Sequence, residues 1–194
     1  MITRKVLALV DESNLLGAAR VLNRRLDWNQ IRDYLADPEQ GRELLEFVVY
    51  VGLPPAGMSA YQEQRDKKLR FVYWLRTNGF LVVAKDGSPT EDCRFKADMD
   101  VMMAIDGVAL AAEMRPDTVI LVTGDSDFAY LALTLRRRGI RVEVAAIAQT
   151  LGNELRASAN DVIDLRKLFN RFEEMYVSAD RVDNNELVKE CAQE

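Results

Sequence analysis

The stretch Thr118-Val-Ile-Leu-Val-Thr-Gly-Asp125-Ser-Asp127 decides how this chain folds. Its first half is a continuous apolar run, which is typical of a strand buried on both faces of a parallel sheet. The run ends in a glycine and two acidic residues. The pattern therefore predicts a buried strand over residues 118–123, with polar groups placed at its carboxyl end.

The same arrangement occurs near the start of the chain, where Val6-Leu-Ala-Leu-Val10 leads directly into Asp11. Further apolar runs occupy residues 47–51, 80–84 and 141–147. Helical periodicity is found between them, at residues 28–35, 60–78, 99–114, 128–138 and 153–158. Strands that alternate with helices, joined by right-handed crossovers, predict an α/β three-layer sandwich with a mostly parallel central sheet and helices on both faces. Residues 52–57 are predicted to form a loop at the rim of the sheet.

Composition excludes several kinds of chemistry. The 194 residues contain no histidine, which removes the Ser-His-Asp triad, Cys-His nucleophiles, imidazole-bound zinc and histidine general bases. Cys93 and Cys191 are too few for a zinc cluster or a disulfide framework. Any catalysis must therefore use carboxylates, hydroxyls, amides and cations.

Charge and hydropathy limit the partners and the cellular location that we expect for the protein. The net charge of −5 does not select a partner, because the clustering of charge matters more than its sum. No apolar run approaches the ~18 residues that a bilayer span needs. The first residues, Met1-Ile-Thr-Arg-Lys5, lead straight into a short apolar run without the features of a secretory signal. We therefore expect a cytoplasmic location with no membrane partner.

Acidic residues occupy the positions at which open α/β sheets bind ligands, outside the carboxyl ends of the strands. Asp11 and Asp125 each follow a predicted strand, Asp127 lies two residues further on, and Asp100 falls in the first turn of a predicted helix. Any one of them could be a turn former or a helix cap. Capping, however, does not require acids from separate segments to converge. Two carboxylates at ~4 Å repel by about 4 kcal/mol at an effective dielectric constant near 20, so an ion-free site would protonate one of them.

A divalent cation removes this repulsion, and oxygen ligands favour Mg²⁺ or Mn²⁺ over zinc. Because such an ion holds phosphate oxygens and activates a bound water, a site without histidine suits phosphodiester hydrolysis. Asn14 would face the same mouth, where its amide could bind a phosphate oxygen or a metal-bound water, or serve only as a cap. The hydroxyls of Thr123 and Ser126 could hydrogen-bond a carboxylate, water or phosphate, and Ser126 could equally cap the next helix.

Three motifs resemble the NYN domain, in its LabA-like branch. They are Asp11-Glu-Ser-Asn14-Leu-Leu, the segment from Lys96 through Asp100-Val-Met-Met-Ala-Ile-Asp106, and Leu121-Val-Thr-Gly-Asp125-Ser-Asp127-Phe-Ala-Tyr-Leu. The resemblance extends from about residue 5 to residue 166. It implies a nuclease domain over residues 1–166, followed by a C-terminal helix and polar tail over residues 167–194.

The resemblance also implies a PIN-like Rossmannoid fold and a metal-dependent ribonuclease. The site residues of the family fall on Asp11, Asn14, Asp100, Asp125 and Asp127, of which the four acids would hold one or two Mg²⁺ or Mn²⁺ ions. In-line attack by a water that Asp127 orients would leave a 5′-phosphate and a 3′-hydroxyl.

Two further acids have a lower rank as ligands. Asp106 matches a frequent acid of the family, but nearly two helical turns separate it from Asp100 and place it deeper. Asp98 departs from the family pattern, and its carboxylate either joins the cluster or points to solvent.

Cations near the acids are the predicted contacts to RNA phosphates. They are Lys96 and Arg94, just before the acidic helix, and Arg65, Lys67, Lys68 and Arg70 on the predicted helix over residues 60–78. For the second group, a solvated helix face is the alternative interpretation. The expected substrate is single-stranded or structured RNA. The alternatives are a non-catalytic regulatory module with the same fold, and a metal-dependent DNA nuclease or phosphatase.

The tail from residue 166 is predicted to be helical in its first half and polar at its end. Leu168, Phe172, Met175 and Tyr176 form one apolar stripe at helical spacing. We expect this stripe to pack on the chain's own sheet. A homodimer, in which the stripe contacts a second copy, is the alternative.

Overall fold

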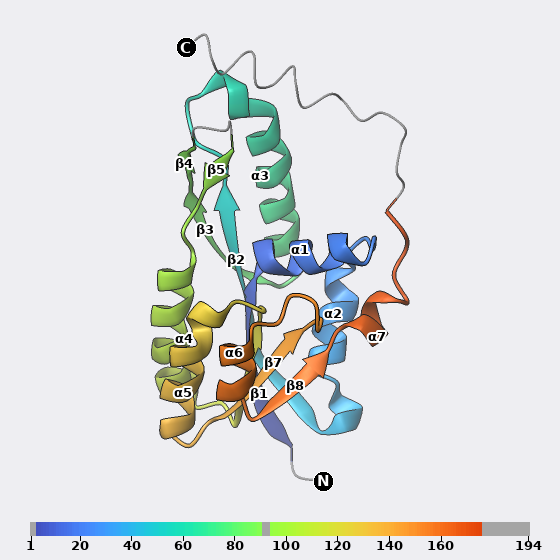
Figure 1. Ribbon diagram of the computed structural model, residues 1–194, viewed down its shortest axis with the longest axis vertical. Helices are drawn as coiled ribbons and strands as arrows, with labels where there is room; N and C mark the ends of the chain where they lie inside the picture. The colour runs from blue at the N-terminus through green and yellow to red at the C-terminus, as the bar shows by residue number, and fades with distance from the viewer. Residues whose placement is uncertain (1–2, 91–93, 176–194) are drawn as a thin grey trace.

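The computed structural model describes residues 3–90 and 94–175. A six-stranded sheet of order β3-β2-β1-β6-β7-β8 forms its centre, and every pair of neighbours is parallel (Figure 1). The strands of this sheet are β1 (Arg4–Asp11), β2 (Arg42–Leu53), β3 (Leu81–Asp86), β6 (Thr118–Val122), β7 (Arg141–Ala146) and β8 (Asp161–Asp164). A short antiparallel pair, β4 (Ser88–Pro89) with β5 (Phe95–Lys96), lies outside it. The predicted α/β class is confirmed.

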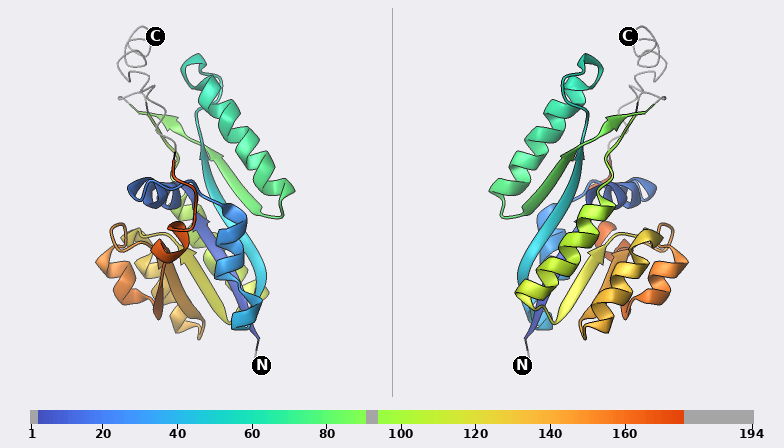
Figure 2. Two further views of the ribbon diagram at one scale, coloured as in Figure 1. Left: turned by 90° about the vertical axis from the view of Figure 1, so that its right-hand side faces the viewer. Right: turned by 90° about the vertical axis from the view of Figure 1, so that its left-hand side faces the viewer.

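Helices cover both faces of the sheet, so the domain has three layers (Figure 2). One face is covered by α1 (Glu12–Val21), α2 (Trp28–Leu35), α3 (Gln62–Thr77) and α7 (Arg166–Phe169). The opposite face is covered by α4 (Asp100–Met114), α5 (Ala129–Arg137) and α6 (Asn153–Ser158). Three 3₁₀ turns are η1 (Pro38–Gln40), η2 (Ser59–Tyr61) and η3 (Ser126–Phe128).

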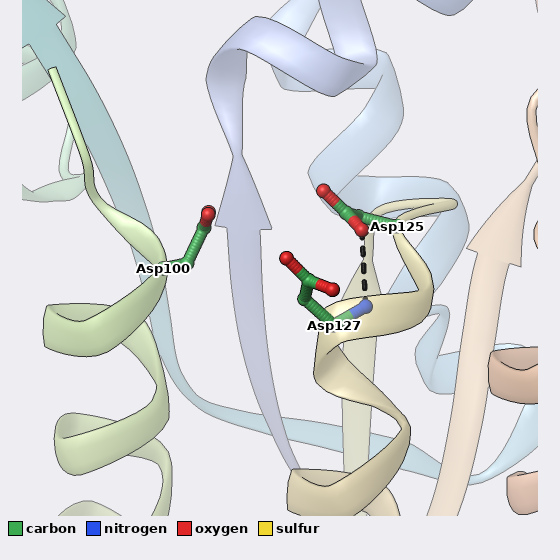
Figure 3. Close-up of side chains that lie close together, drawn as sticks. All are labelled: Asp100, Asp125 and Asp127. Carbon is green, nitrogen blue, oxygen red and sulfur yellow. Dashed lines mark hydrogen bonds between the residues drawn. The ribbon is translucent and has the colours of Figure 1, made fainter. Parts of the chain in front are cut away.

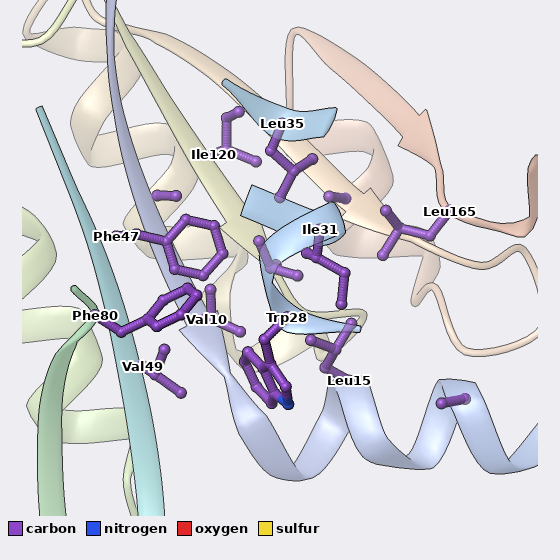
Figure 4. Packing of buried hydrophobic residues seen from close by; sticks show 14 of the residues in the cluster. Val10, Leu15, Trp28, Ile31, Leu35, Phe47, Val49, Phe80, Ile120 and Leu165 are labelled. Atoms are coloured by element: carbon purple, nitrogen blue, oxygen red, sulfur yellow. The ribbon is translucent and has the colours of Figure 1, made fainter. Parts of the chain in front are cut away.

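The central strand β1 shows why its sequence is apolar throughout. Val6, Ala8 and Val10 point into the core beneath α1 and α2, whereas Leu7 and Leu9 point into the core beneath α4 and α5. Figure 4 shows the first of these cores, where Val10 lies among aromatic and aliphatic side chains of α2 and the neighbouring strands. Because successive residues of a strand face opposite sides, a strand between two helical layers needs apolar side chains at every position.

Most predicted elements are present, and α2 and α6 have the predicted bounds. Helix α1 was not predicted, because it begins directly after β1, without a linker that would separate the two patterns. Strand β8 was not predicted either, since it is only four residues long and begins and ends with aspartate. The loop predicted over residues 52–57 is wrong for Gly52 and Leu53, since both pair with β3 and extend β2.

The helix predicted for the first half of the tail is wrong over residues 170–175, because α7 ends at Phe169. Glu174 instead forms an isolated antiparallel bridge with Arg24. Leu168 and Phe172 are buried in the core, so these two residues of the apolar stripe pack on the chain's own sheet, whereas Met175 is only half-buried. Tyr176 and the polar end lie outside the described residues. Across the described ranges, no helix is both long enough and apolar enough to span a bilayer.

Candidate metal centre

The candidate site lies at the carboxyl edge of the sheet, between β1 and β6. These two strands are parallel neighbours, with Val10 opposite Val122 in the register. Strand order reverses here, because β2 lies on one side of β1 while the chain returns on the other side with β6. Asp11 ends β1 and Asp125 follows β6, so the two acids reach the crevice where open α/β sheets bind ligands.

The turn after β6 positions Asp125 and Asp127. The Asp125 carboxylate caps η3, since its Oδ1 accepts a hydrogen bond from the Asp127 amide at 3.0 Å (Figure 3). The Asp125 amide donates to the hydroxyl of Thr123 at 3.2 Å. Thr123 is buried and also donates a long bond of 3.5 Å to Asp11. The bond to the Asp11 carboxylate is one of the roles that the sequence position of Thr123 allowed, and the bond from the Asp125 amide supports the backbone beneath the acids.

Asp100 reaches the same place from the other side of β1, at the first turn of α4 (Figure 3). One carboxylate oxygen from each of Asp100, Asp125 and Asp127 lies within 4.8 Å of the other two. Oxygens bound to opposite sides of one Mg²⁺ are separated by about 4.2 Å. Small side-chain rotations would therefore bring all three carboxylates onto a single ion, and an all-oxygen donor set fits Mg²⁺ or Mn²⁺.

The electrostatics of Asp100 reflect this crowding. Its pKa is raised from 3.8 to about 6, first by burial and then by the negative charges of Asp11, Asp125, Asp98 and Asp127. The crevice therefore disfavours the charged form of one carboxylate, as expected for acids that converge without a counter-ion. A bound cation would reverse the effect and hold Asp100 in its charged form.

Asp11 and Asn14 organise the start of α1. The Asp11 Oδ1 accepts hydrogen bonds from the Ser13 hydroxyl at 2.8 Å and from the Asn14 amide at 3.1 Å, so it caps the helix. The Asn14 side chain accepts a hydrogen bond from the Gly124 amide at 2.8 Å and ties α1 to the turn that carries Asp125. Asp11 lines the crevice but lies outside the group of three carboxylates. Its role as a metal ligand stays a prediction.

Close packing on the far side of this turn requires a glycine at position 124. A Cβ added to Gly124 would lie 2.1 Å from the carbonyl oxygen of Thr150, so no larger residue fits. The Gly124 carbonyl also accepts a hydrogen bond from the Gly152 amide at 2.8 Å. The Ser126 hydroxyl lies against Gly152, where a Cβ would be 2.1 Å away. The contact that the structure shows for Ser126 is therefore with this turn, while the cap of η3 comes from Asp125.

The two lower-ranked acids are placed differently. Asp106 accepts a hydrogen bond from the buried Tyr50 hydroxyl at 3.1 Å, below the carboxylate group, as its position along α4 predicts. Burial and the charge of Asp106 raise the pKa of Tyr50. Asp98 is exposed and lies 4.0 Å from the Lys96 ammonium. It lines the crevice and acts on Asp100 through its charge, but it is not part of the group of three.

The predicted RNA-binding cations have different surroundings. Arg65 is largely buried, forms an ion pair with Asp86 at 2.8 Å and donates to the Pro54 carbonyl, which gives it a structural role. Its contact to an RNA phosphate stays a prediction. Lys67 pairs with Glu63 one turn away on α3 and is exposed. Arg94 is exposed, and its carbonyl accepts a hydrogen bond from the Tyr61 hydroxyl.

Lys96 and Lys68 both line the crevice. The crevice has a volume of about 350 Å³ and is also lined by Tyr50 and Glu12. Sequence reasoning missed both of these residues. Glu12 occurs in the sequence only as the residue after Asp11, and nothing in the sequence connects it to Lys68, 56 positions away.

Comparisons with known proteins agree with this architecture. The profile of the NYN domain matches residues 5–167. The crystal structure of a protein of unknown function from Vibrio parahaemolyticus superposes with a TM-score of 0.65 at 25% sequence identity, and covers 86% of this chain and 96% of that chain. A pyrazinamidase/nicotinamidase from Streptococcus mutans aligns over 86% of this chain and 97% of its own, but its TM-score of 0.35 and identity of 14% are too low to indicate a shared fold or function. No curated protein matches the sequence.

The profile match spans most of the chain, and the parallel sheet with helices on both faces is the expected PIN-like nuclease architecture. This chain belongs to the NYN domain family.

Proposed function

We propose that this protein is a metal-dependent endoribonuclease of the LabA-like branch, acting on RNA in the cytoplasm. The observation that carries the proposal is the convergence of Asp100, Asp125 and Asp127 within 4.8 Å at the crevice of an NYN fold. Three converging acids destabilise an ion-free protein. A bound divalent ion would offset this repulsion and would explain why the three acids lie close together.

Asp100, Asp125 and Asp127 would hold the ion, with Asp11 and Asp98 adding negative charge around it. When bound, Mg²⁺ or Mn²⁺ neutralises charge on phosphate oxygens and acidifies a bound water. Asn14 and Thr123 keep the turn in place through their hydrogen bonds. Among the three converging acids, Asp127 is the most exposed, which suits it to accept a proton from an attacking water at the mouth of the crevice.

The direct test is incubation of purified protein with labelled single-stranded RNA and Mg²⁺, Mn²⁺ or EDTA. We expect cleavage with either metal, none with EDTA, and products that carry 5′-phosphates. Asp125→Asn is the informative variant, because asparagine keeps the Oδ1 acceptor that caps η3 and removes only the charge. We expect its rate to fall by at least 100-fold. Asp33→Asn, at an exposed acid on α2, is the matched control and should cleave normally.

The same experiment separates the alternatives. Cleavage of DNA in preference to RNA, or hydrolysis of a phosphomonoester alone, would replace the ribonuclease by another metal-dependent hydrolase. A wild-type protein that binds Mn²⁺ by calorimetry but cleaves no nucleic acid would indicate a regulatory module. Unchanged cleavage by Asp125→Asn would refute the assignment of the site.

A further inference from the structure

A buried ion pair forms one wall of the crevice. The Lys68 ammonium lies 2.6 Å and 2.8 Å from the two carboxylate oxygens of Glu12 and joins α3 to α1. The Glu12 side chain is only 3% exposed, and that of Lys68 is 22% exposed. The Lys68 ammonium also lies over the ring of Phe71, 5.8 Å from its centroid. These contacts hold an ammonium group in one place at the surface of the crevice.

The pair adjoins the carboxylates. Glu12 directly follows Asp11, and the Asp11 charge contributes to a raised pKa of Glu12, whose main cause is burial. Both members of the pair line the crevice together with Asp11, Asp100 and Asp125. The other cation of the described lining residues, Lys96, is 76% exposed and faces Asp98 at 4.0 Å. Lys68 is therefore the more rigidly held positive charge beside the acids.

Stability alone does not account for this arrangement. Burial of a charged pair costs desolvation free energy that the mutual attraction of its members often fails to recover, and apolar residues of similar size can replace such pairs without loss. An ammonium has three N–H donors, and the two Glu12 oxygens occupy two of them. Within residues 3–90 and 94–175 no third acceptor contacts the ammonium, so its remaining donor can bind an oxygen within the crevice. Lysine is a frequent phosphate ligand because its charge is compact.

We infer that Lys68 binds a backbone phosphate of the RNA strand next to the carboxylate site, and that Glu12 is a positioning residue that holds the Lys68 ammonium there. The inference rests on the proposed function and adds a substrate contact to it. The phosphate brings negative charge to an acidic crevice, and Lys68 supplies the opposite charge at a fixed point. A pre-positioned ammonium strengthens binding because no side-chain ordering accompanies it.

The test compares Lys68→Met, Glu12→Gln and a combined variant that carries Glu12→Met together with Lys68→Met. Lys68→Met alone leaves Glu12 buried without a partner and can destabilise the protein. The combined variant replaces the ion pair by two apolar side chains of similar length, so it should fold and melt like wild type. Lys5→Met is the matched control, since Lys5 is exposed at the opposite end of β1.

Binding is measured by fluorescence anisotropy with labelled single-stranded RNA, each change being placed in an Asp125→Asn background that does not cleave. We expect the combined variant to bind about 10-fold more weakly than its parent at moderate salt. We also expect the slope of log affinity against log salt to become shallower by about 0.7, the value for one lost single-strand phosphate contact. Lys5→Met should change neither quantity. In the cleaving protein, the combined change should raise KM and leave kcat within a few-fold of wild type.

The outcomes separate this inference from the proposed function. RNA affinity and salt slope equal to those of the parent in the combined variant would show that the pair is only structural, and would overturn the inference while wild-type cleavage stands. A wild-type protein that neither binds nor cleaves RNA would refute both. Glu12→Gln alone should keep the salt slope, because Lys68 retains its charge, but should weaken binding two- to three-fold as the ammonium becomes less well placed.

Discussion

Replacement of Asp100 by asparagine tests whether the carboxylates repel one another without an ion and bind one when it is supplied. The pKa of Asp100 is raised from 3.8 to about 6 by burial and by neighbouring acids. Because the folded protein holds this proton more tightly than the unfolded chain does, Asp100 destabilises the fold only when it is charged. Its unfavourable contribution therefore grows as the pH rises from about 4 to about 6, and is complete above that range. The asparagine of the variant would be neutral at every pH.

The expected magnitude follows from the shift. A change of about two pKa units corresponds to about 3 kcal/mol if it is fully realised. Asp100 is partly exposed, however, and water screens its interactions with the other acids, so we expect about 1 kcal/mol. For a domain of this size, that free energy corresponds to a melting temperature higher by about 3 °C. With EDTA present, Asp100→Asn should melt above wild type at pH 8 and close to it at pH 4.

Mn²⁺ should reverse the order of stability. An ion at 100 times its dissociation constant stabilises the wild-type fold by about 2.7 kcal/mol, whereas the variant lacks one ligand and should gain much less. Differential scanning calorimetry with EDTA and with increasing Mn²⁺ measures both effects, and Asp33→Asn serves as the control for the loss of a carboxylate. A melting difference between Asp100→Asn and wild type that is the same at pH 4 and pH 8 would refute the repulsion. Equal stabilisation of both proteins by Mn²⁺ would refute the ligand role.

Further predictions concern the supports of the site, and urea denaturation measures each of them. Gly124→Ala should lower the free energy of unfolding by about 3 kcal/mol, because its Cβ would meet a backbone carbonyl at 2.1 Å; an effect below about 1 kcal/mol would show that the turn can move. Gly17→Ala, with open space around its Cβ on α1, should instead stabilise the protein by about 0.5–1 kcal/mol. Asn14→Ala should cost about 1–3 kcal/mol through the unpaired Gly124 amide, and a variant as stable as wild type would contradict that bond. Lys68→Met should cost about 3 kcal/mol at pH 8 and less at pH 4, where Glu12 becomes protonated; a cost independent of pH would argue against the unpaired charge.

The sequence predicts the layered sheet well because its signals are local. The run before Asp125 is apolar at every position and ends in a glycine, so both its burial and its end can be recognised without a partner strand. The adjacency of β1 and β6 could also be anticipated, since an acidic residue lies at the carboxyl end of each strand. Asp106 was placed below the site by helical geometry alone, and its bond with Tyr50 agrees with that placement.

The rest of the site depends on contacts between distant segments. Glu12 and Lys68 are each ordinary helix residues, and only the packing of α1 against α3 makes them a buried pair. Arg65 looks the same in sequence as Lys68, yet one turns toward Asp86 and the other toward the crevice. A run of charged residues shows that a helix face is polar, but it does not show which of the charged side chains is held in a buried ion pair. The tail was mispredicted for a related reason, because its apolar spacing fits a helix while Phe172 reaches the core through a turn.

The turn after β6 is held in place on two sides. Asn14 accepts a hydrogen bond from the Gly124 amide on one side, and the backbone around Thr150 packs against the turn on the other. The acids that it carries cannot spread apart to relieve their mutual repulsion when no ion is present. The chain would thus keep its shape with and without an ion, and binding of a divalent ion would require no reorganisation of the backbone. Under these conditions the slow step of ion uptake would be the loss of water from the ion itself, which is slower for Mg²⁺ than for larger cations. Metal exchange would then be governed by the chemistry of the ion and not by the motion of a loop.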